Sequence, residues 1–384
     1  MMRKSKVIIL ALILLVLVAA AVFVVAFVTK EDQQLSESII KKEPDQTELP
    51  SQLYNDFAKL LTDDGEKQND FKEISLLIDD NIISPHVSTD GGSIYYLSDD
   101  LDAIMKRSLK SDKQEVYFSD DLLQDTEELI WSPENDEAYL NTTKGFYLYK
   151  VTDNSVFELS KNIKDISYSL NGGRIAYQYI NYISDENYFS VSNPDGSNYV
   201  NLIDIQPVDE EASDGIVFGW FPDNQTVYYA YESSDVSGSE FEKVNVRNKE
   251  VSKMDDWGDI GEILFAPSFG KVLYVIFDNE NFIPQIWIMD EDGSNRRYTG
   301  IDNFLSKCIV QHKKPILVCA LSEKVFGVDS NDVIVKYNIE TSGIEPVTRL
   351  DNAKVYNINN ILLSQDDQKI YFLNNIDQKL YVVE

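Results

Sequence analysis

A nine-residue signature that occurs seven times along the chain constrains the fold more than any other feature. Its copies begin at Ser88, Ser132, Ser169, Phe221, Ala266, Gln311 and Ser364. Successive copies start 37 to 53 residues apart, and most set a cluster of Ser, Pro, Asp, Asn or Gly between two short apolar runs. Such a cluster is typical of a tight hairpin between two strands. A period in the forties, with several short strands per unit, predicts a β-propeller.

The residues around each signature indicate how its strands are packed. The first and third residues before each copy are nearly all apolar, as in Trp131 and Leu129, and therefore share one strand face. The residue between them varies from copy to copy: His86, Ile130, Ser167, Gly219, Leu264, Ile309 and Leu362. The second strand ends in apolar residues, as in Val227 to Tyr229, which predicts that both of its faces are covered. With third and fourth strands in most units, we expect an all-β propeller of seven blades, each of four antiparallel strands.

The two ends of the repeat region suggest how the ring closes. The last unit ends at residues 379–384, which read as its third strand, so its outer strand is missing. The segment Phe71 to Asp79 (FKEISLLID) is a strand-like segment just before the first unit. It could supply the missing strand and remove an exposed sheet edge. We therefore assign residues 71–384 to the propeller and residues 71–79 to a closing strand.

These repeats resemble those of the TolB-like or WD40-like (PD40) propellers. That family's repeat reads S-P-D-G-x-x-I-A-Y and is followed by a D-G-S turn. Here residues 221–229 keep the Pro-Asp pair, residues 174–177 keep the end of the motif, and Asp195-Gly196-Ser197 and Asp292-Gly293-Ser294 match the later turn. The copy at Gln311 departs most, because it lacks the Ser and Gly. The resemblance covers about residues 72–384 and implies a membrane-anchored propeller.

The N-terminus contains a long apolar segment. Val7 to Val28 is a run of 22 residues without a charged or polar side chain. As a helix it would span a hydrocarbon core of about 30 Å. A cleaved signal peptide is the alternative, although such apolar regions are usually about 7 to 15 residues long. A buried core helix would need a polar face, which the run lacks. We interpret it as an uncleaved signal-anchor and single-pass transmembrane helix.

Charges on either side of this segment predict its orientation. Arg3, Lys4 and Lys6 precede it and Glu31 and Asp32 follow it, so the positive-inside rule places the tail of residues 1–6 in the cytoplasm. The protein would then lie in the cell membrane, with the bulk of the chain extracytoplasmic. Residues 29–70 are polar and poor in aromatics, and they read as a stalk with a short amphipathic helix at 51–63.

The charge balance excludes one class of partner. Residues 1–30 contain four basic residues and no acidic one, so the remainder carries 30 bases against 65 acids, a formal charge of −35. Such a surface repels phosphate backbones. We therefore expect no nucleic-acid partner.

A search for catalytic motifs finds none. The sequence has no G-x-S-x-G, no P-loop and no G-x-G-x-x-G. Its two histidines, His86 and His312, lie in different units, which argues against a His-based metal cluster. His86 could face the central channel, but a satisfied structural role is the simpler interpretation, and His312 reads as a solvated loop residue. We predict no catalytic, cofactor-binding or metal-binding residues and no cofactor.

Two acidic features leave calcium binding as an alternative. The segment Asp290 to Asn295 superficially resembles a calcium loop, but its Gly is fourth rather than sixth, so a hairpin turn is the simpler interpretation. Acidic loop pairs such as Asp366-Asp367 could bind Ca²⁺ weakly, although solvated charge that keeps the domain soluble explains them as well.

The two cysteines, Cys308 and Cys319, lie opposite each other in the inferred hairpin register. Directly opposed residues of antiparallel strands have Cβ atoms about 4.5 to 5.5 Å apart, so a disulfide is feasible with some adjustment. Since the same positions hold apolar residues in other units, two small core residues remain the favoured interpretation.

Taken together, these features favour a non-catalytic, membrane-tethered extracytoplasmic module that binds or scaffolds a protein or glycan partner. The partner would contact a propeller face, with aromatic residues near Trp257 or in the range Tyr179 to Tyr188 as anchors. The alternative is a propeller enzyme of hydrolase or lyase type that uses the central channel. It would need inward-facing carboxylates, and the variable residues between the apolar pairs include none.

Overall fold

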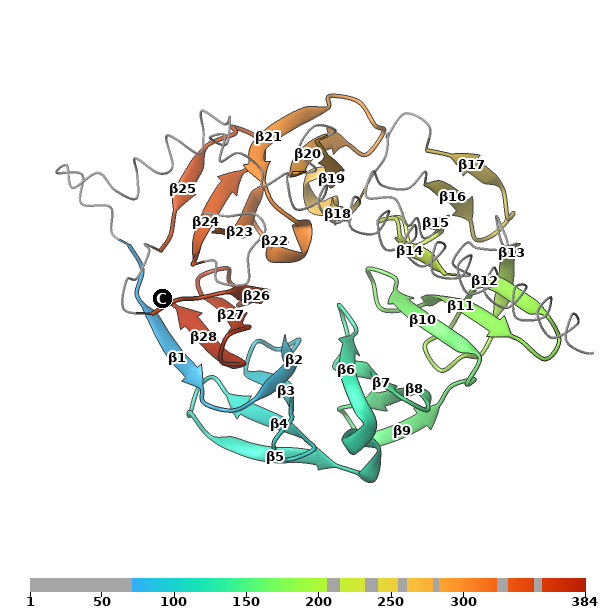
Figure 1. The fold of residues 1–384 in the computed structure, drawn as a ribbon, viewed down its shortest axis with the longest axis horizontal. Helices are drawn as coiled ribbons and strands as arrows, with labels where there is room; N and C mark the ends of the chain where they lie inside the picture. The colour runs from blue at the N-terminus through green and yellow to red at the C-terminus, as the bar shows by residue number, and fades with distance from the viewer. Residues whose placement is uncertain are drawn as a thin grey trace, which may run out of the picture. The chain divides into compact units, whose positions relative to one another are not determined.

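The computed structural model describes residues 71–205, 215–231, 241–254, 261–278, 283–322, 331–348 and 354–384. In this part of the chain, seven four-stranded antiparallel sheets follow one another around a ring (Figure 1). Each sheet is one blade, and the first strand of each blade lies nearest the centre of the ring. The prediction of an all-β propeller with seven four-stranded blades is confirmed.

The first four blades follow the chain in order. Blade 1 comprises β2 (Ile82–Val87), β3 (Ser93–Ser98), β4 (Ala103–Ser108) and β5 (Gln114–Ser119). Blade 2 comprises β6 (Thr126–Trp131), β7 (Glu137–Thr142), β8 (Gly145–Lys150) and β9 (Ser155–Glu158). Blade 3 comprises β10 (Ile163–Tyr168), β11 (Ile175–Asn181), β12 (Glu186–Ser192) and β13 (Val200–Asp204). Blade 4 comprises β14 (Ile216–Trp220), β15 (Thr226–Tyr231), β16 (Glu242–Asn245) and β17 (Val251–Lys253).

The remaining blades complete the ring. Blade 5 comprises β18 (Ile263–Ala266), β19 (Lys271–Phe277), β20 (Pro284–Asp290) and β21 (Arg297–Asp302). Blade 6 comprises β22 (Cys308–Val310), β23 (Ile316–Ser322), β24 (Asp332–Asn338) and β25 (Ile344–Pro346). Blade 7 comprises β26 (Ile358–Leu363), β27 (Ile370–Asn374), β28 (Lys379–Val383) and, from the start of the chain, β1 (Ile74–Ile78). Three short 3-10 helices lie between strands: η1 (Asp121–Asp125), η2 (Pro267–Phe269) and η3 (Leu305–Lys307).

The ring is closed by strands from both ends of the described chain. β1 pairs antiparallel with β28, with Ile74 opposite Val383 and Leu76 opposite Tyr381. The outer strand of blade 7 is therefore supplied by residues more than 300 positions earlier in the sequence. Lys379 and Asp79, which are 300 positions apart, add an ion pair at the end of this pairing. This pairing covers the edge of β28, which would otherwise be an unpaired strand edge.

The signature forms the same hydrogen-bonded turn in several blades. The hydroxyl of Ser88 donates to Asp90 Oδ1 at 2.7 Å and accepts from the backbone N–H of Ser93 at 3.0 Å. Ser169 and Asn171 form the equivalent contact in blade 3, and Ser364 and Asp366 form it in blade 7. A Ser followed two residues later by Asp or Asn thus fixes the hairpin, because its side chains satisfy backbone donors inside the turn.

The apolar core lies between the blades. Each of the seven buried clusters joins two neighbouring blades, and together they extend around the ring. The second and third strands are the most deeply buried, and every residue of β3 is buried. A strand with covered faces on both sides reads as a continuous apolar run, which explains the pattern of the sequence.

Polar contacts add to this packing by tying each inner hairpin to the next. The backbone N–H of Thr89 in blade 1 donates to Asp136 of blade 2 at 2.8 Å, and that of Asn171 in blade 3 donates to Asn224 of blade 4 at 3.1 Å. The indole N–H of Trp131 also donates to the Ser84 carbonyl of the preceding blade at 2.8 Å.

The apolar run Val7 to Val28, the stalk at 29–70 and the helix expected at 51–63 lie outside the described residues. Across residues 71–384, apart from the gaps given above, no helix is long and apolar enough to cross a bilayer. The helices there are 3-10 segments of three to five residues, whereas a span needs about 20 apolar residues. The structure therefore does not support the predicted localisation, in which a single helix crosses the membrane and most of the chain is extracytoplasmic, and we withdraw that prediction.

Candidate functional site

One position of the inner strands is polar in almost every blade. It lies four residues before the signature, and we call its residues the inner column: Ser84, Glu128, Asp165, Val217, Glu262, Lys307 and Asn360. Three of the seven are carboxylates. In β6 and β10 the pairing is regular from this position onward, so Glu128 and Asp165 share a strand face with the variable residues two positions later, Ile130 and Ser167. The prediction from the sequence considered only those later residues, which are not carboxylates.

β-Bulges at the start of four inner strands change the direction of the side chains near the inner column. The pairing register shifts between Ile83 and His86 in β2, and between Asn359 and Ile361 in β26. In β6 it shifts just before Glu128, and in β10 just before Asp165. A bulge sets two residues against one and redirects nearby side chains, and such bulges are frequent beside active sites. Both Glu128 and Asp165 are exposed.

Glu128 and Asp165 interact electrostatically across the boundary between blades 2 and 3. Although the Glu128 side chain reaches solvent, the surrounding protein atoms desolvate its carboxyl group and raise its pKa, and repulsion from the Asp165 carboxylate raises it further. A hydrogen bond with Asn141, its partner on β7, opposes this shift. In such a pair, the carboxyl group with the higher pKa stays protonated and can act as a general acid, while the other group is a charged carboxylate.

The other members of the inner column contact neighbouring segments. Ser84 accepts a hydrogen bond from the backbone N–H of Leu129 at 3.1 Å, and Glu262 accepts one from Ser306 at 3.0 Å. Lys307 forms an ion pair with the buried Asp332, with 2.9 Å between Nζ and Oδ2. These three residues have structural contacts, and so do Glu128, through Asn141, and Asp165, which accepts from the backbone N–H of Ile166 at 2.7 Å. Glu128 and Asp165 are the candidate reactive pair because their two carboxyl groups interact with each other.

His86 lies between blades 1 and 2. Its ring stacks on Trp131 with a centroid distance of 4.6 Å, and its Nε2 lies 3.8 Å from Asp136. Burial lowers the pKa of His86, although Asp136 opposes this effect. His86 is thus a blade-interface residue that favours the neutral form, but the satisfied role expected from the sequence is not seen, because its buried Nε2 has no hydrogen-bond partner among the described residues.

His312 and Asp367 connect blades 6 and 7. The His312 ring nitrogen Nδ1 lies 2.8 Å from Asp367 Oδ1, and the backbone N–H groups of His312 and Lys313 donate to the same carboxylate. His312 is exposed in the turn between β22 and β23, as expected, and its ring and backbone also contact the buried Asp367. The Asp366-Asp367 pair is likewise engaged in internal hydrogen bonds.

The segment Asp290 to Asn295 forms a hairpin turn. Asp290 forms an ion pair with Lys271 and also accepts from Ser294 and Asn295, and its hydrogen bond with Lys271 is the main cause of its lowered pKa. Asp292 accepts from the backbone N–H of Ser294 at 2.9 Å. Within the described ranges, no three His, Cys, Asp or Glu side chains meet in a group that could hold a metal ion.

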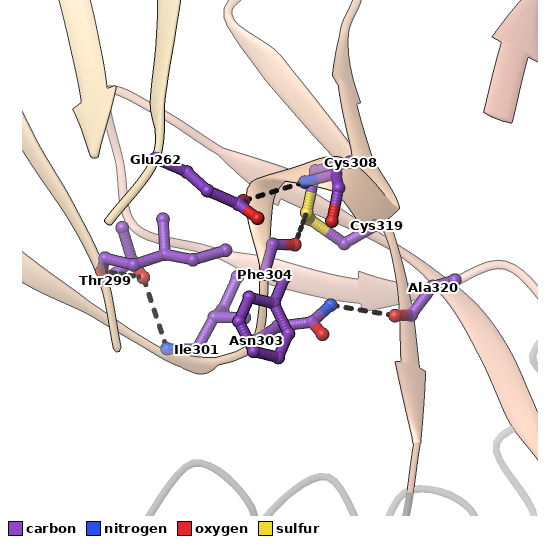
Figure 2. The surroundings of a disulfide bond; sticks show 10 residues. Glu262, Thr299, Ile301, Asn303, Phe304, Cys308, Cys319 and Ala320 are labelled. Atoms are coloured by element: carbon purple, nitrogen blue, oxygen red, sulfur yellow. Dashed lines mark hydrogen bonds between the residues drawn. A yellow bond between two sulfur atoms is a disulfide. The ribbon is translucent and has the colours of Figure 1, made fainter. Parts of the chain in front are cut away.

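Cys308 and Cys319 form a disulfide between β22 and β23 (Figure 2). The two residues are directly paired across the strands, with a Cα–Cα distance of 4.2 Å. Nearby, the Asn303 side chain donates to the Ala320 carbonyl at 2.8 Å, which ties the segment before η3 to β23. The favoured interpretation of two free core cysteines was therefore wrong, and the alternative, a disulfide, is present in the structure.

Comparison with solved structures supports the fold. An oligogalacturonate lyase in complex with manganese is 11% identical, with a TM-score of 0.62, over 81% of this chain and 93% of that chain. The oligogalacturonate lyase of Vibrio parahaemolyticus is 9% identical, with a TM-score of 0.61, over 83% and 94%. A streptogramin B lyase is 12% identical, with a TM-score of 0.53, over 82% and 98%. No family model and no curated protein matches the sequence, so the resemblance to TolB-like propellers is not confirmed.

These similarities correct the predicted function. All three structures are enzymes by name, and two of them are lyases of one kind. The prediction of a non-catalytic scaffold over a propeller enzyme was wrong. It rested on the absence of carboxylates from one position of the inner strands. The alternative, a propeller enzyme, accords better with the neighbours and with the Glu128 and Asp165 pair. At these identities the comparison itself shows the fold alone.

Proposed function

We propose that this chain is a propeller enzyme that cleaves a glycan by general acid–base chemistry at Glu128 and Asp165. The observation that carries the proposal is the placement of two carboxylates, Glu128 and Asp165, directly after bulges at the start of neighbouring inner strands. The raised pKa of Glu128 supports it. The names of the similar structures, two of which act on oligogalacturonate, suggest a saccharide and a hydrolase or lyase reaction.

The two carboxyl groups have different roles in this proposal. Glu128, whose proton is held by partial burial and by repulsion, donates it to the oxygen of the leaving group. Asp165, as general base, takes a proton from the water molecule that attacks the anomeric carbon while the bond to the leaving-group oxygen breaks. Pairs of carboxylates with separated pKa values serve these two purposes in glycoside cleavage. Because the described residues do not bring three metal ligands together, we derive no step through a metal ion.

The charge of the protein argues for an uncharged substrate. The chain carries a formal net charge of −31, and the inner column contains three carboxylates against one lysine. A polyanionic chain such as oligogalacturonate would be repelled on approach and again at the site. We therefore propose a neutral oligosaccharide, which distinguishes this chain from the lyases that it resembles.

The test compares Glu128→Gln with wild type on a panel of neutral oligosaccharides and on oligogalacturonate. Hydrolysis releases reducing ends, whereas elimination, which needs the acidic proton beside the carboxyl group of a galacturonate unit, also forms a carbon–carbon double bond that absorbs ultraviolet light. We expect Glu128→Gln to lower kcat/KM by about 100-fold to 10,000-fold, the usual contribution of general acid catalysis. Activity of the wild type should fall as pH rises through the raised pKa of Glu128, because the acid must be protonated.

Glu134→Gln is the matched control, since Glu134 is an exposed glutamate of the same blade, in the turn after β6. It should retain wild-type activity. Circular dichroism should show that all variants are folded. Full activity in Glu128→Gln, or no turnover of any saccharide in the panel, would overturn the proposal, and a preference for oligogalacturonate would overturn its substrate assignment.

A further inference from the structure

A pocket of about 400 Å³ lies between blades 2 and 3, separate from the inner column. It is bounded by the end of β9, the start of β10, and residues of β11, β12 and β13. None of the inner-column residues lines it. Its walls consist mainly of tyrosines and carboxylates: Tyr177, Tyr179, Tyr188, Tyr199, Glu158, Glu186 and Asp195.

The tyrosines form an aromatic wall from the interior to the surface. Tyr177 and Tyr179 share one face of β11, and Tyr179 is directly paired with Tyr188 on β12. Tyr177 is 6% exposed, whereas Tyr199 is 68% exposed, so the rings extend from the floor to the mouth of the pocket. The side-chain amide of Asn162 donates to the Tyr179 hydroxyl at 2.9 Å and holds that ring in place.

The carboxylates add fixed negative charge. Asp195 accepts from both the backbone N–H and the hydroxyl of Ser197, and these bonds lower its pKa, so it is ionised at neutral pH. Glu186 accepts a hydrogen bond from Ser184 at 2.6 Å. The residues that line the pocket include no Lys, Arg or His. Lys150, which contributes to the lowered pKa of Asp195, has its Nζ over the Phe157 ring and does not line the pocket.

We propose that this pocket binds a small organic cation, either a quaternary ammonium ion or a protonated amine. The faces of aromatic rings carry negative electrostatic potential and attract cations, which is how aromatic cages recognise methylated ammonium groups. Three carboxylates around the same volume strengthen that attraction. A neutral ligand of the same shape would gain apolar contact alone, so the site selects for charge rather than for size.

The test uses choline and its neutral isostere 3,3-dimethylbutan-1-ol, which have the same shape but differ in charge. Saturation-transfer NMR on the full chain follows the methyl signal of each ligand. Cation–π contacts contribute about 0.5 to 2 kcal/mol each, so we expect choline to bind at least about tenfold more tightly. Equal binding of the two ligands, or no saturable binding of choline, would overturn the proposal.

Two variants locate the site. Tyr199→Ala removes a ring at the mouth, and Glu158→Gln removes one charge at the exposed end of β9. Each variant should weaken the binding of choline several-fold. Because the isostere is neutral, Glu158→Gln should not change its affinity. Tyr182→Ala is the matched control, because Tyr182 is 71% exposed on the same blade and does not line the pocket. If Tyr199→Ala and Glu158→Gln bind choline as Tyr182→Ala does, the cation binds elsewhere and the assignment fails.

Discussion

At the scale of single residues, Glu128 combines two influences that act in the same direction. Partial burial and the neighbouring Asp165 charge both raise its pKa. Asp165→Asn removes the neighbouring charge but keeps the shape of the side chain, so only the effect of burial remains. This variant should lower the pKa of Glu128 toward its ordinary value without restoring it fully. Carbon-13 NMR titration of the glutamate carboxyls measures this shift. An unchanged pKa in Asp165→Asn would show that the two groups do not interact.

Asp332 is a second residue whose surroundings make a clear prediction. Its side chain is fully buried, and it binds Lys307 at 2.9 Å and the backbone N–H of Ile358 at 2.7 Å, so it joins blade 6 to blade 7. Asp332→Ala leaves a largely buried ammonium group and a backbone donor unpaired. Breaking a buried ion pair from one side costs about 3 to 5 kcal/mol, so we expect a loss of that order in the free energy of unfolding.

Urea denaturation measures this loss, and Glu115→Ala provides the comparison. Glu115 pairs with Lys113 at the surface, where both side chains are exposed. Such a pair contributes at most about 1 kcal/mol. A loss for Asp332→Ala no larger than that for Glu115→Ala would contradict the structural role of the buried pair.

At the scale of elements, the hairpins were predictable and the inner column was not found. Each signature pairs a polar turn with apolar flanks, and the same register placed Cys308 opposite Cys319, as in the structure. Two residues before the signatures of blades 2 and 3 lie Ile130 and Ser167, which gave no indication of an acidic site. Two residues further, period-two alternation reaches Glu128 and Asp165 on the same strand face, so this signal was present in the sequence.

Other features of the site depend on contacts that no local pattern encodes. The bulges before Glu128 and Asp165 shift the register within single strands, and bulges have weak sequence signals. The contact between His312 and Asp367 joins residues 55 positions apart in different blades. The pocket between blades 2 and 3 likewise arises from the packing of two sheets, although the sequence did single out the aromatic range from Tyr179 to Tyr188.

The disulfide gives a prediction at this scale. It links residues 11 positions apart and closes the hairpin of β22 and β23, in the blade whose signature departs most from the others. Loop-closure entropy for a loop of this length predicts that the double variant Cys308→Ser, Cys319→Ser loses about 3 kcal/mol at most. Denaturation of oxidised wild type, reduced wild type and the double variant checks this, and the last two should agree. Equal stability of all three would show that the bond does not form.

At the scale of the whole molecule, stability is distributed around the ring, because each apolar cluster joins two neighbouring blades. Such a ring depends on its closure. If β1 separates from β28, blade 7 loses its outer strand and an edge becomes available for pairing with other chains. Opening at this point should therefore affect the cooperativity of unfolding as well as its midpoint.

Ser75 tests the closure with little change in side-chain packing, because it lies in β1 opposite Val382 and is exposed. The Glu384 N–H donates to the Glu73 carbonyl, so alternation along the strands places the N–H groups of Ser75 and Val382 within the same pairing. Ser75→Pro removes one of these N–H groups and distorts the strand, which costs about 3 kcal/mol when a proline interrupts regular structure. Ser75→Ala keeps the backbone intact and should stay close to wild type. Hydrogen exchange of the Val382 and Glu384 amides, which face β1, should accelerate in Ser75→Pro alone. If those amides remain equally protected while the protein is destabilised, the ring does not depend on β1 for its closure.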